Sequence, residues 1–329
     1  MTVMTTMQAV VLDAQGRYQV TDRPVPVAGP GEVAVRVGYA GVQWGDTMVR
    51  DGHFPVPRPF VPGFEAAGRI VSVGDGVDGG RVGEAVAVLT ASGCCAEVVV
   101  APAVLALPVG RLPLRTAAAA GWSTPTAYDL VNTAARVRPG ERVLVHAAAG
   151  GVGTLAVQFA RLGGAASVTG VAGSPERAAY AAEFGYDEVL LRDDFPAALG
   201  DRRFDVVLDP VGAGTRRESL QLLAPHGRLV AYGNIAGYEP ILADTNDLLM
   251  RGASLLTYNS SLLSSTHPER LAASVRAALD LLADGKVRVD VTAEYELGEL
   301  ALAVERLADG TTRGKSVLRV GGPAVHQNI

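Results

Sequence analysis

The sequence predicts an α/β protein in which a β-rich module precedes a doubly wound parallel sheet with helices on both faces. Short runs rich in Val and Ala, bounded by Gly, Pro and Asp, fill roughly the first hundred residues. Strand-like and helix-like segments then alternate, which is typical of a parallel sheet. The 329 residues, 48% of them hydrophobic, are enough for two domains with buried cores.

The β-rich module is expected to hold a series of short strands joined by turns. These strands are predicted at residues 8–12, 31–41, 66–74, 84–89 and 96–101. Residues 23–32 and 54–63 carry many prolines, and we expect them to be loops or sheet edges because proline cannot donate a ladder hydrogen bond.

The alternating region begins after an Ala-rich helical segment, residues 114–137, which Gly121 and Pro125 interrupt. Strands are predicted at 141–148, 165–171, 187–191, 203–210 and 227–233, and helices at 150–163, 174–185 and 215–225. Two helices, 268–285 and 297–310, and a strand at 315–320 follow. This tail either extends the second sheet or returns to the first module.

The segment from His146 to Gly153 has the clearest functional pattern. It follows an apolar strand and precedes a helix whose apolar residues recur at helical spacing. This strand–turn–helix order is the context that a dinucleotide fingerprint requires. Glycines permit a tight turn and a close approach to a pyrophosphate, which the helix amino terminus attracts. The pattern is a variant, because Ala148 stands at the first glycine position. The predicted cofactor contacts of this Rossmann domain are Ala148, Gly150, Gly151, Val152 and Gly153.

The end of the second strand of this domain favours NADPH over NADH. NAD binders usually place an acid there for the ribose 2′-hydroxyl. Here the strand ends at Gly173 and Ser174, and Arg177 follows. A hydroxyl and a guanidinium bind a 2′-phosphate well. Ser174 is also a good helix N-cap, and one residue can serve both purposes.

Charge and cysteine content exclude other classes of protein. A net charge of −5 offers no basic surface for nucleic acid, and no apolar run is long enough for a membrane helix. The first residues lack a basic and apolar leader pattern, so we expect no secretory signal. Cys94 and Cys95 are adjacent, a spacing that rarely permits a disulfide, and we expect reduced thiols in a cytoplasmic protein.

The sequence resembles the medium-chain dehydrogenase/reductase superfamily, in its quinone oxidoreductase (zeta-crystallin-like) branch. The resemblance covers nearly the whole chain and is carried by residues 39–55, 59–74, 146–153, 171–185, 204–212, 227–234 and 314–320. It implies a GroES-like catalytic domain at 1–118, a Rossmann NADPH-binding domain at 119–256, and a return to the catalytic domain at 257–329. It also implies a homodimer.

The same resemblance implies a reductase without zinc. In the zinc alcohol dehydrogenases of this superfamily, the metal ligands occupy positions that match Gln43, Phe64 and the Gly121–Trp122 pair here. Catalytic zinc needs about three protein ligands beside an open position, and these residues do not supply them. Without a Lewis acid, hydride must go to an acceptor that is already electrophilic. A small-molecule quinone or α,β-unsaturated carbonyl fits this requirement.

Three residues are the candidates for catalysis. Gln43 and Asp46 match family positions near the nicotinamide, where an Asn commonly replaces Gln43. Related enoyl reductases carry a tyrosine as candidate proton donor, and Phe54 stands there in this chain. His53 beside it, or water, would have to supply the proton.

The resemblance adds four cofactor candidates outside the phosphate loop. These are Thr126 before the loop, Arg192 near the adenosine phosphate, Asn234 after a strand end, and Lys315 before the last strand. Two other functions stay open at this point. One is an enoyl-thioester reductase that tailors acyl or polyketide intermediates, and the other is a cofactor-binding protein with little turnover.

Overall fold

The computed structural model describes residues 5–321 as two compact units. Within the described residues, the first unit comprises residues 5–125 and 263–321, and the second comprises residues 126–262. The units divide the chain a few residues later than the sequence predicts. Helix α2 (Leu114–Ala120) packs on strands of the first unit through its buried residues Ala117 to Ala120, which keeps this segment with the first unit.

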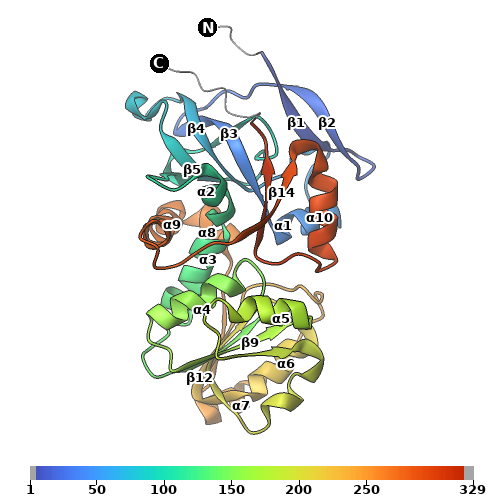
Figure 1. Cartoon of the computed structure of the whole chain (residues 1–329), viewed down its shortest axis with the longest axis vertical. Helices are drawn as coiled ribbons and strands as arrows, with labels where there is room; N and C mark the ends of the chain where they lie inside the picture. The colour runs from blue at the N-terminus through green and yellow to red at the C-terminus, as the bar shows by residue number, and fades with distance from the viewer. Residues whose placement is uncertain (1–4, 322–329) are drawn as a thin grey trace. The chain divides into compact units, whose positions relative to one another are not determined.

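The first unit is built around a seven-stranded sheet in which six strands have the order β14-β15-β3-β4-β5-β7 and the seventh, β6, pairs with β3. Figure 1 labels β3, β4, β5 and β14 of this sheet. The strands are β3 (Glu32–Val42), β4 (Glu65–Val73), β5 (Ala85–Leu89), β6 (Val98–Pro102), β7 (Ala106–Pro108), β14 (Val291–Glu296) and β15 (Lys315–Arg319). A hairpin of β1 (Thr6–Leu12) and β2 (Tyr18–Pro24) accompanies it. Because β15 pairs antiparallel with β3, the carboxy-terminal segment returns to the first module.

Within residues 5–321, six α-helices lie wholly or partly in the first unit. They are α1 (Trp44–Arg50), α2, α3 (Ser123–Asp129), α8 (Ser260–Thr266), α9 (Pro268–Ala283) and α10 (Leu300–Ala308). Helices α3 and α8 contain the boundaries between the units. Across residues 5–321, no helix combines the length and the apolar character needed to cross a bilayer.

The second unit confirms the predicted doubly wound sheet. Its six parallel strands have the order β10-β9-β8-β11-β12-β13, and Figure 1 shows α4 and α5 on one side of the sheet and α6 and α7 on the other. The strands are β8 (Arg142–His146), β9 (Ser167–Ala172), β10 (Glu188–Leu191), β11 (Phe204–Asp209), β12 (Leu223–Ala231) and β13 (Ser254–Thr257). The helices are α4 (Gly153–Leu162), α5 (Pro175–Ala182), α6 (Ala213–Gln221) and α7 (Thr245–Arg251). The strand order reverses between β8 and β11, which is the position where such sheets bind ligands.

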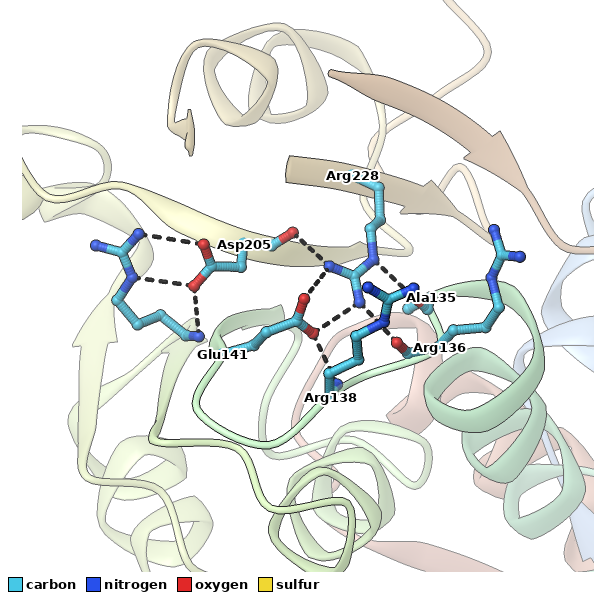
Figure 2. Close-up of polar contacts among 7 residues, drawn as sticks. Ala135, Arg136, Arg138, Glu141, Asp205 and Arg228 are labelled. Atoms are coloured by element: carbon cyan, nitrogen blue, oxygen red, sulfur yellow. Dashed lines mark hydrogen bonds and ion pairs between the residues drawn. The ribbon is translucent and has the colours of Figure 1, made fainter. Parts of the chain in front are cut away.

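Arg228 stabilises the region where β8 and β11 begin through a network of hydrogen bonds. Figure 2 shows the Arg228 guanidinium between the Glu141 carboxylate and the carbonyl groups of Ala135 and Arg136. Its Nη1 and Nη2 each lie 2.7 Å from a Glu141 oxygen, and Nε donates to the Ala135 carbonyl at 2.5 Å. Nη1 also donates to the carbonyl of Asp205 in β11. This network holds the turn before β8 to the sheet, at the end opposite the phosphate loop.

Candidate active site

The phosphate loop turns sharply from β8 into α4. Ala147 adopts a left-handed conformation with φ 54°, and Gly150 N donates to the Ala147 carbonyl at 2.9 Å. Gly153 is required here, because a Cβ at this position would lie 2.4 Å from the Ala147 carbonyl oxygen. The first N–H groups of an α-helix have no partner within the helix. The start of α4 therefore presents backbone donors and the positive end of its dipole, as a pyrophosphate requires.

Ala148 replaces the first fingerprint glycine, and the neighbouring strand accommodates its methyl group. Ala148 is fully buried, and its backbone N donates to the carbonyl of Val171 in β9 at 3.0 Å. A Cβ at Gly170 would lie only 2.8 Å from the Ala148 Cβ. The glycine in β9 thus provides the space that the variant fingerprint needs.

The residues predicted to bind the 2′-phosphate come together where β9 ends. Ser174 caps α5, and its Oγ accepts from the Arg177 backbone N at 3.3 Å. A Cβ at Gly173 would lie 4.0 Å from Nη1 of Arg192. Burial lowers the pKa of Arg177, and the positive charge of Arg192 lowers it further. Two guanidinium groups that repel each other beside an exposed glycine suit the charge of a dianion, and binding of the 2′-phosphate here stays a prediction.

The loops that follow β11 and β12 form a second polar cluster, which the sequence analysis did not identify. Asp209, the last residue of β11, is fully buried, and its Oδ2 accepts from Nε of Arg216 at 2.6 Å. Arg216 also donates to Oδ1 of Asn234 at 3.1 Å. Asn234, predicted to contact the cofactor, is therefore held by an arginine on α6. Segment 204–212, which carries part of the family resemblance, contains Asp209, but no sequence motif pointed to the arginine.

His146 supports the phosphate loop from within the second unit. It is buried at the end of β8, with Nε2 2.8 Å from the Ser219 Oγ of α6 and its ring edge-to-face with Phe195 at 4.7 Å. Burial lowers the pKa of His146 to about 4. The neutral imidazole thus links β8 to α6 and has no exposed face for chemistry.

The catalytic candidates lie on and beside α1 in the first unit. Gln43 is the N-cap of α1, and its backbone N donates to Oδ2 of Asp46 at 2.9 Å. Asp46 is only 1% exposed, and its Oδ1 has no hydrogen-bond partner. Burial raises the pKa of Asp46 to about 7. This carboxyl shapes the turn that carries Gln43, so the geometry gives Asp46 a positioning role, and its direct part in catalysis stays a prediction.

His53 and Phe54 lie in the turn that follows α1. Both are exposed, and the Phe54 N donates to the Met48 carbonyl at 3.0 Å. The turn therefore keeps the imidazole accessible near the same helix that positions Gln43. Its role as a proton donor stays a prediction.

The positions that match the zinc ligands are close together in the first unit. A Cβ at Gly45 would lie 3.3 Å from the Phe64 ring and 3.7 Å from Cδ of Gln43. The indole Nε1 of Trp122 donates to the Phe64 carbonyl at 2.7 Å. Across residues 5–321, no group of three or more His, Cys, Asp or Glu side chains is placed to hold a metal ion. Burial raises the pKa of the Cys94 and Cys95 thiols, which disfavours their thiolate forms.

A buried ion pair lies beside these positions. Nζ of Lys315 is 2.6 Å from Oε1 of Glu65 and 3.1 Å from the Val42 carbonyl oxygen. Oε2 of Glu65 accepts from the Trp122 N at 2.6 Å. The ammonium of Lys315 is thus engaged by two acceptors inside the first unit, and direct cofactor contact by Lys315 stays a prediction that this geometry does not favour. Thr126, also a predicted cofactor contact, is buried in α3 at the start of the second unit.

Two family models match the chain, one over each module. The model described as "Alcohol dehydrogenase GroES-like domain" matches residues 29–111, and the model described as "Zinc-binding dehydrogenase" matches residues 151–283. The first match covers the β-rich sheet, and the second begins in the phosphate loop. They agree with the predicted pairing of a GroES-like module and a Rossmann domain.

Individual proteins extend the similarity to almost the whole chain. The chain is 34% identical to a quinone oxidoreductase of Pseudomonas aeruginosa, over 88% of this chain and 91% of the relative. It is 32% identical to the phthioceranic/hydroxyphthioceranic acid synthase of Mycobacterium tuberculosis, over 89% of this chain but only 14% of the synthase. The structure of an Escherichia coli quinone oxidoreductase complexed with NADPH superposes with a TM-score of 0.84 at 29% identity, covering 96% of this chain and 100% of the other.

The geometry and the similarities point to the same assignment. The variant phosphate loop, the strand order and the β-rich module form the two-part architecture that the family models describe. The similarity to the Pseudomonas enzyme extends across most of both chains. The chain therefore belongs to the medium-chain dehydrogenase/reductase superfamily, in its quinone oxidoreductase branch.

Proposed function

We propose that this protein is an NADPH-dependent reductase that transfers hydride, without zinc, to a quinone or an α,β-unsaturated carbonyl. The observation that carries the proposal is the arrangement at the edge of the second unit. A glycine-rich turn opens α4, and Arg177 and Arg192 gather beside Gly173 where an NAD-dependent protein would place an acid. The quinone oxidoreductases similar to this chain support the same activity.

The residues of the second unit fit NADPH. The backbone from Gly150 to Gly153 would hold the pyrophosphate, and Ser174, Arg177 and Arg192 would hold the 2′-phosphate. Bound NADPH would supply the hydride, and the protein supplies orientation and electrostatic stabilisation. The similarity to a structure complexed with NADPH supports this choice of cofactor.

Replacement of Arg177 by alanine tests the choice of cofactor. The Arg177→Ala variant should bind NADPH at least tenfold more weakly, since a charge-assisted hydrogen bond contributes about 1.5–3 kcal/mol. Affinity for NADH should change little, because NADH has no 2′-phosphate. Fluorescence titration of both cofactors measures the ratio. An unchanged preference for NADPH would remove Arg177 from the 2′-phosphate site.

Chemistry in the first unit would rely on hydrogen bonding in place of a metal. Gln43, Phe64 and Trp122 occupy the zinc-ligand positions, and none offers the ligand set that catalytic zinc requires. The side-chain amide of Gln43 would donate a hydrogen bond to the acceptor oxygen as negative charge develops there. The proton that completes reduction would come from His53 or from water.

Acceptor preference in the absence of metal is the direct test of this function. NADPH oxidation by EDTA-treated protein should be fast with an ortho-quinone and slow with a short 2-enoyl thioester. The quinone needs no Lewis acid, because the charge that hydride transfer creates is delocalised onto oxygen. If the protein oxidised NADPH with neither acceptor, the proposed quinone reductase activity would be contradicted and a binding function favoured.

A second candidate function is reduction of enoyl thioesters. The similarity to a segment of a mycobacterial acid synthase favours it, although the chain spans 14% of that protein's length. Phe54 at the position of the tyrosine in related enoyl reductases weighs against a tyrosine-dependent mechanism. Faster turnover with the 2-enoyl thioester than with the quinone would move the assignment to this reaction.

The quaternary structure and cellular location of the protein are further parts of the proposal. The family resemblance suggests a homodimer, and the two cysteines, both buried and reduced, suit the cytoplasm. Sedimentation velocity at micromolar concentration would measure the mass in solution directly. A monomer at all concentrations would contradict the proposed dimer.

A further inference from the structure

Arg216 joins the ends of two neighbouring strands in the second unit. Its Nε donates to Asp209 at 2.6 Å, its Nη2 to the Gly233 carbonyl at 2.6 Å, and its Nη1 to Oδ1 of Asn234 at 3.1 Å. The Arg216 side chain is 14% exposed and that of Asp209 is fully buried. We call Arg216, Asp209, Gly233 and Asn234 the Arg216 clamp.

Hydrogen bonds of the clamp and of the backbone connect the loop after β11 to the loop after β12. Asp209 Oδ1 accepts from the backbone N of Val211 at 2.6 Å and of Gly212 at 3.1 Å, which fixes the first loop. Ile235 N donates to the Pro210 carbonyl at 3.0 Å, and Ala236 N donates to the Val211 carbonyl at 2.9 Å. Since Arg216 bonds to both loops, its loss would release Asn234 while these backbone bonds remain.

The position of the clamp in the sheet tells which part of the cofactor it would meet. The 2′-phosphate residues are at the end of β9 and the pyrophosphate loop is at the end of β8. The strand order continues from β8 to β11 and β12. An extended dinucleotide with its adenosine over β9 must therefore place its nicotinamide half over the ends of β11 and β12, where the clamp is.

The clamp also determines which way the Asn234 amide faces. A guanidinium has only donors, so it selects the amide oxygen Oδ1 and turns the amide nitrogen Nδ2 away. Asn234 is exposed, and its Nδ2 is thereby presented as a donor at the carboxyl edge of the sheet. The nicotinamide half offers matching acceptors, a ribose hydroxyl and a carboxamide oxygen.

We propose that Arg216 is a positioning residue for the nicotinamide half of the cofactor, acting through Asn234, whose amide nitrogen donates to that half. This inference rests on the proposed binding of NADPH. A lysine cannot replace Arg216, because its single ammonium cannot reach three acceptors in a fixed planar geometry. Asparagine is likewise required at 234, because an aspartate would keep the bond to Arg216 and lose the donor.

The test compares a whole cofactor with a fragment that lacks nicotinamide. The dissociation constants of NADPH and adenosine 2′,5′-bisphosphate are measured for wild type, Arg216→Met, Asn234→Asp and Arg177→Ala. Arg216→Met and Asn234→Asp should weaken NADPH about tenfold, the effect of one lost hydrogen bond, and leave the fragment within about twofold of wild type. Arg177→Ala should weaken both ligands. Arg216→Met and Asn234→Asp should also raise KM for NADPH more than they lower kcat.

One control keeps the outcome decisive. Asn234→Asp retains an acceptor for Arg216, so its melting temperature should not fall, and it remains informative if Arg216→Met does not fold. Equal weakening of both ligands, or unchanged NADPH affinity in Asn234→Asp, would overturn the positioning role. If wild type bound neither NADPH nor the fragment, the proposed function would be overturned, and this inference with it.

Discussion

Asp46 illustrates how one residue can organise a catalytic turn without touching a substrate. Its Oδ2 accepts the backbone N–H of Gln43, and it lies almost wholly out of solvent. Burial favours the neutral acid and raises the pKa of this carboxyl to about 7. An unfolded aspartate has a pKa of about 3.9, so the folded protein holds this proton over a wide pH range.

Stability should therefore depend on pH through Asp46. Because the folded pKa is the higher one, the contribution of Asp46 to stability is complete below about pH 4 and disappears as pH rises through 7. Between pH 5 and 8, wild type should lose roughly 3 kcal/mol of unfolding free energy relative to Asp46→Asn, because the loss runs at about 1.4 kcal/mol per pH unit up to pH 7 and then stops. Urea unfolding of both proteins at the two pH values measures the difference.

The exposed Asp193 provides a matched control for this experiment, because its side chain is 91% exposed. Asp193→Asn should follow the wild-type pH profile closely. Parallel profiles for wild type and Asp46→Asn would show that Asp46 is already ionised in the folded protein.

At the scale of elements, the turn between β8 and α4 tolerates little change in side-chain size. Gly153 has no space for a side chain, since an added Cβ would meet the carbonyl oxygens of Ala147 and Ala148 at 2.4 and 2.7 Å. The Tyr186 hydroxyl also donates to the Gly153 carbonyl at 2.8 Å, which secures the first turn of α4. A shift of this turn would move every backbone donor that the proposed pyrophosphate site needs.

Gly153→Ala should both destabilise the protein and abolish cofactor binding. Overpacking against two carbonyl groups should cost about 1–3 kcal/mol, and NADPH affinity should fall at least tenfold as the α4 amino terminus moves. Gly214→Ala is the control, because a Cβ at this position in α6 would meet no atom within 4 Å apart from its chain neighbours and its own helix backbone. Chemical denaturation and NADPH titration of the two variants make the comparison. If Gly153→Ala bound NADPH as wild type does, the proposed pyrophosphate site would be wrong.

The sequence predicted the long periodic elements better than the short ones. The phosphate loop and helix α9 follow strong patterns and appear where they were expected. Helix α1 was missed, because Gln43 is not a typical N-cap and Gly45 weakens the helical pattern. The predicted helix 215–225 ends earlier, at Gln221, and β12 already begins at Leu223 and contains the left-handed His226. Helix propensity could not anticipate pairing with the neighbouring strand.

The candidate site could be predicted from the sequence where its residues lie close together along the chain. Glycines of the phosphate loop and the Ser174–Arg177 turn are local signals, and the structure brings Gly173, Ser174, Arg177 and Arg192 together. Glu65 and Arg216 were missed because their roles depend on partners in other elements. The Glu65–Lys315 pair spans 250 residues, and no pattern within either segment indicates it.

At the scale of the whole molecule, this ion pair joins the carboxy-terminal strand β15 to β4 of the first unit. Lys315 belongs to β15 and Glu65 to β4, and both side chains are buried. Gly41 and Gly121 leave the space that Glu65 occupies, because a Cβ at either position would lie within 2.9 Å of its side chain. The return of the chain is thus fixed by charge as well as by the pairing of β15 with β3.

Removal of one partner of the ion pair should cost more than removal of both. Lys315→Met should destabilise the protein by about 3–5 kcal/mol, because it leaves the Glu65 carboxylate buried without its cation. The double variant Lys315→Met, Glu65→Gln should recover part of that loss. Unfolding free energies of the two single variants and the double variant give the coupling. Additive effects would show that the two groups do not act as a pair.

The most direct test of zinc-free catalysis combines turnover with metal analysis of one sample. Zinc content is measured by mass spectrometry before and after EDTA treatment, and NADPH oxidation by an ortho-quinone is followed in each sample. A zinc-free NADPH-dependent reductase should keep its full kcat with far less than one zinc per chain. Loss of turnover on metal removal, with recovery on addition of zinc, would contradict zinc-free catalysis.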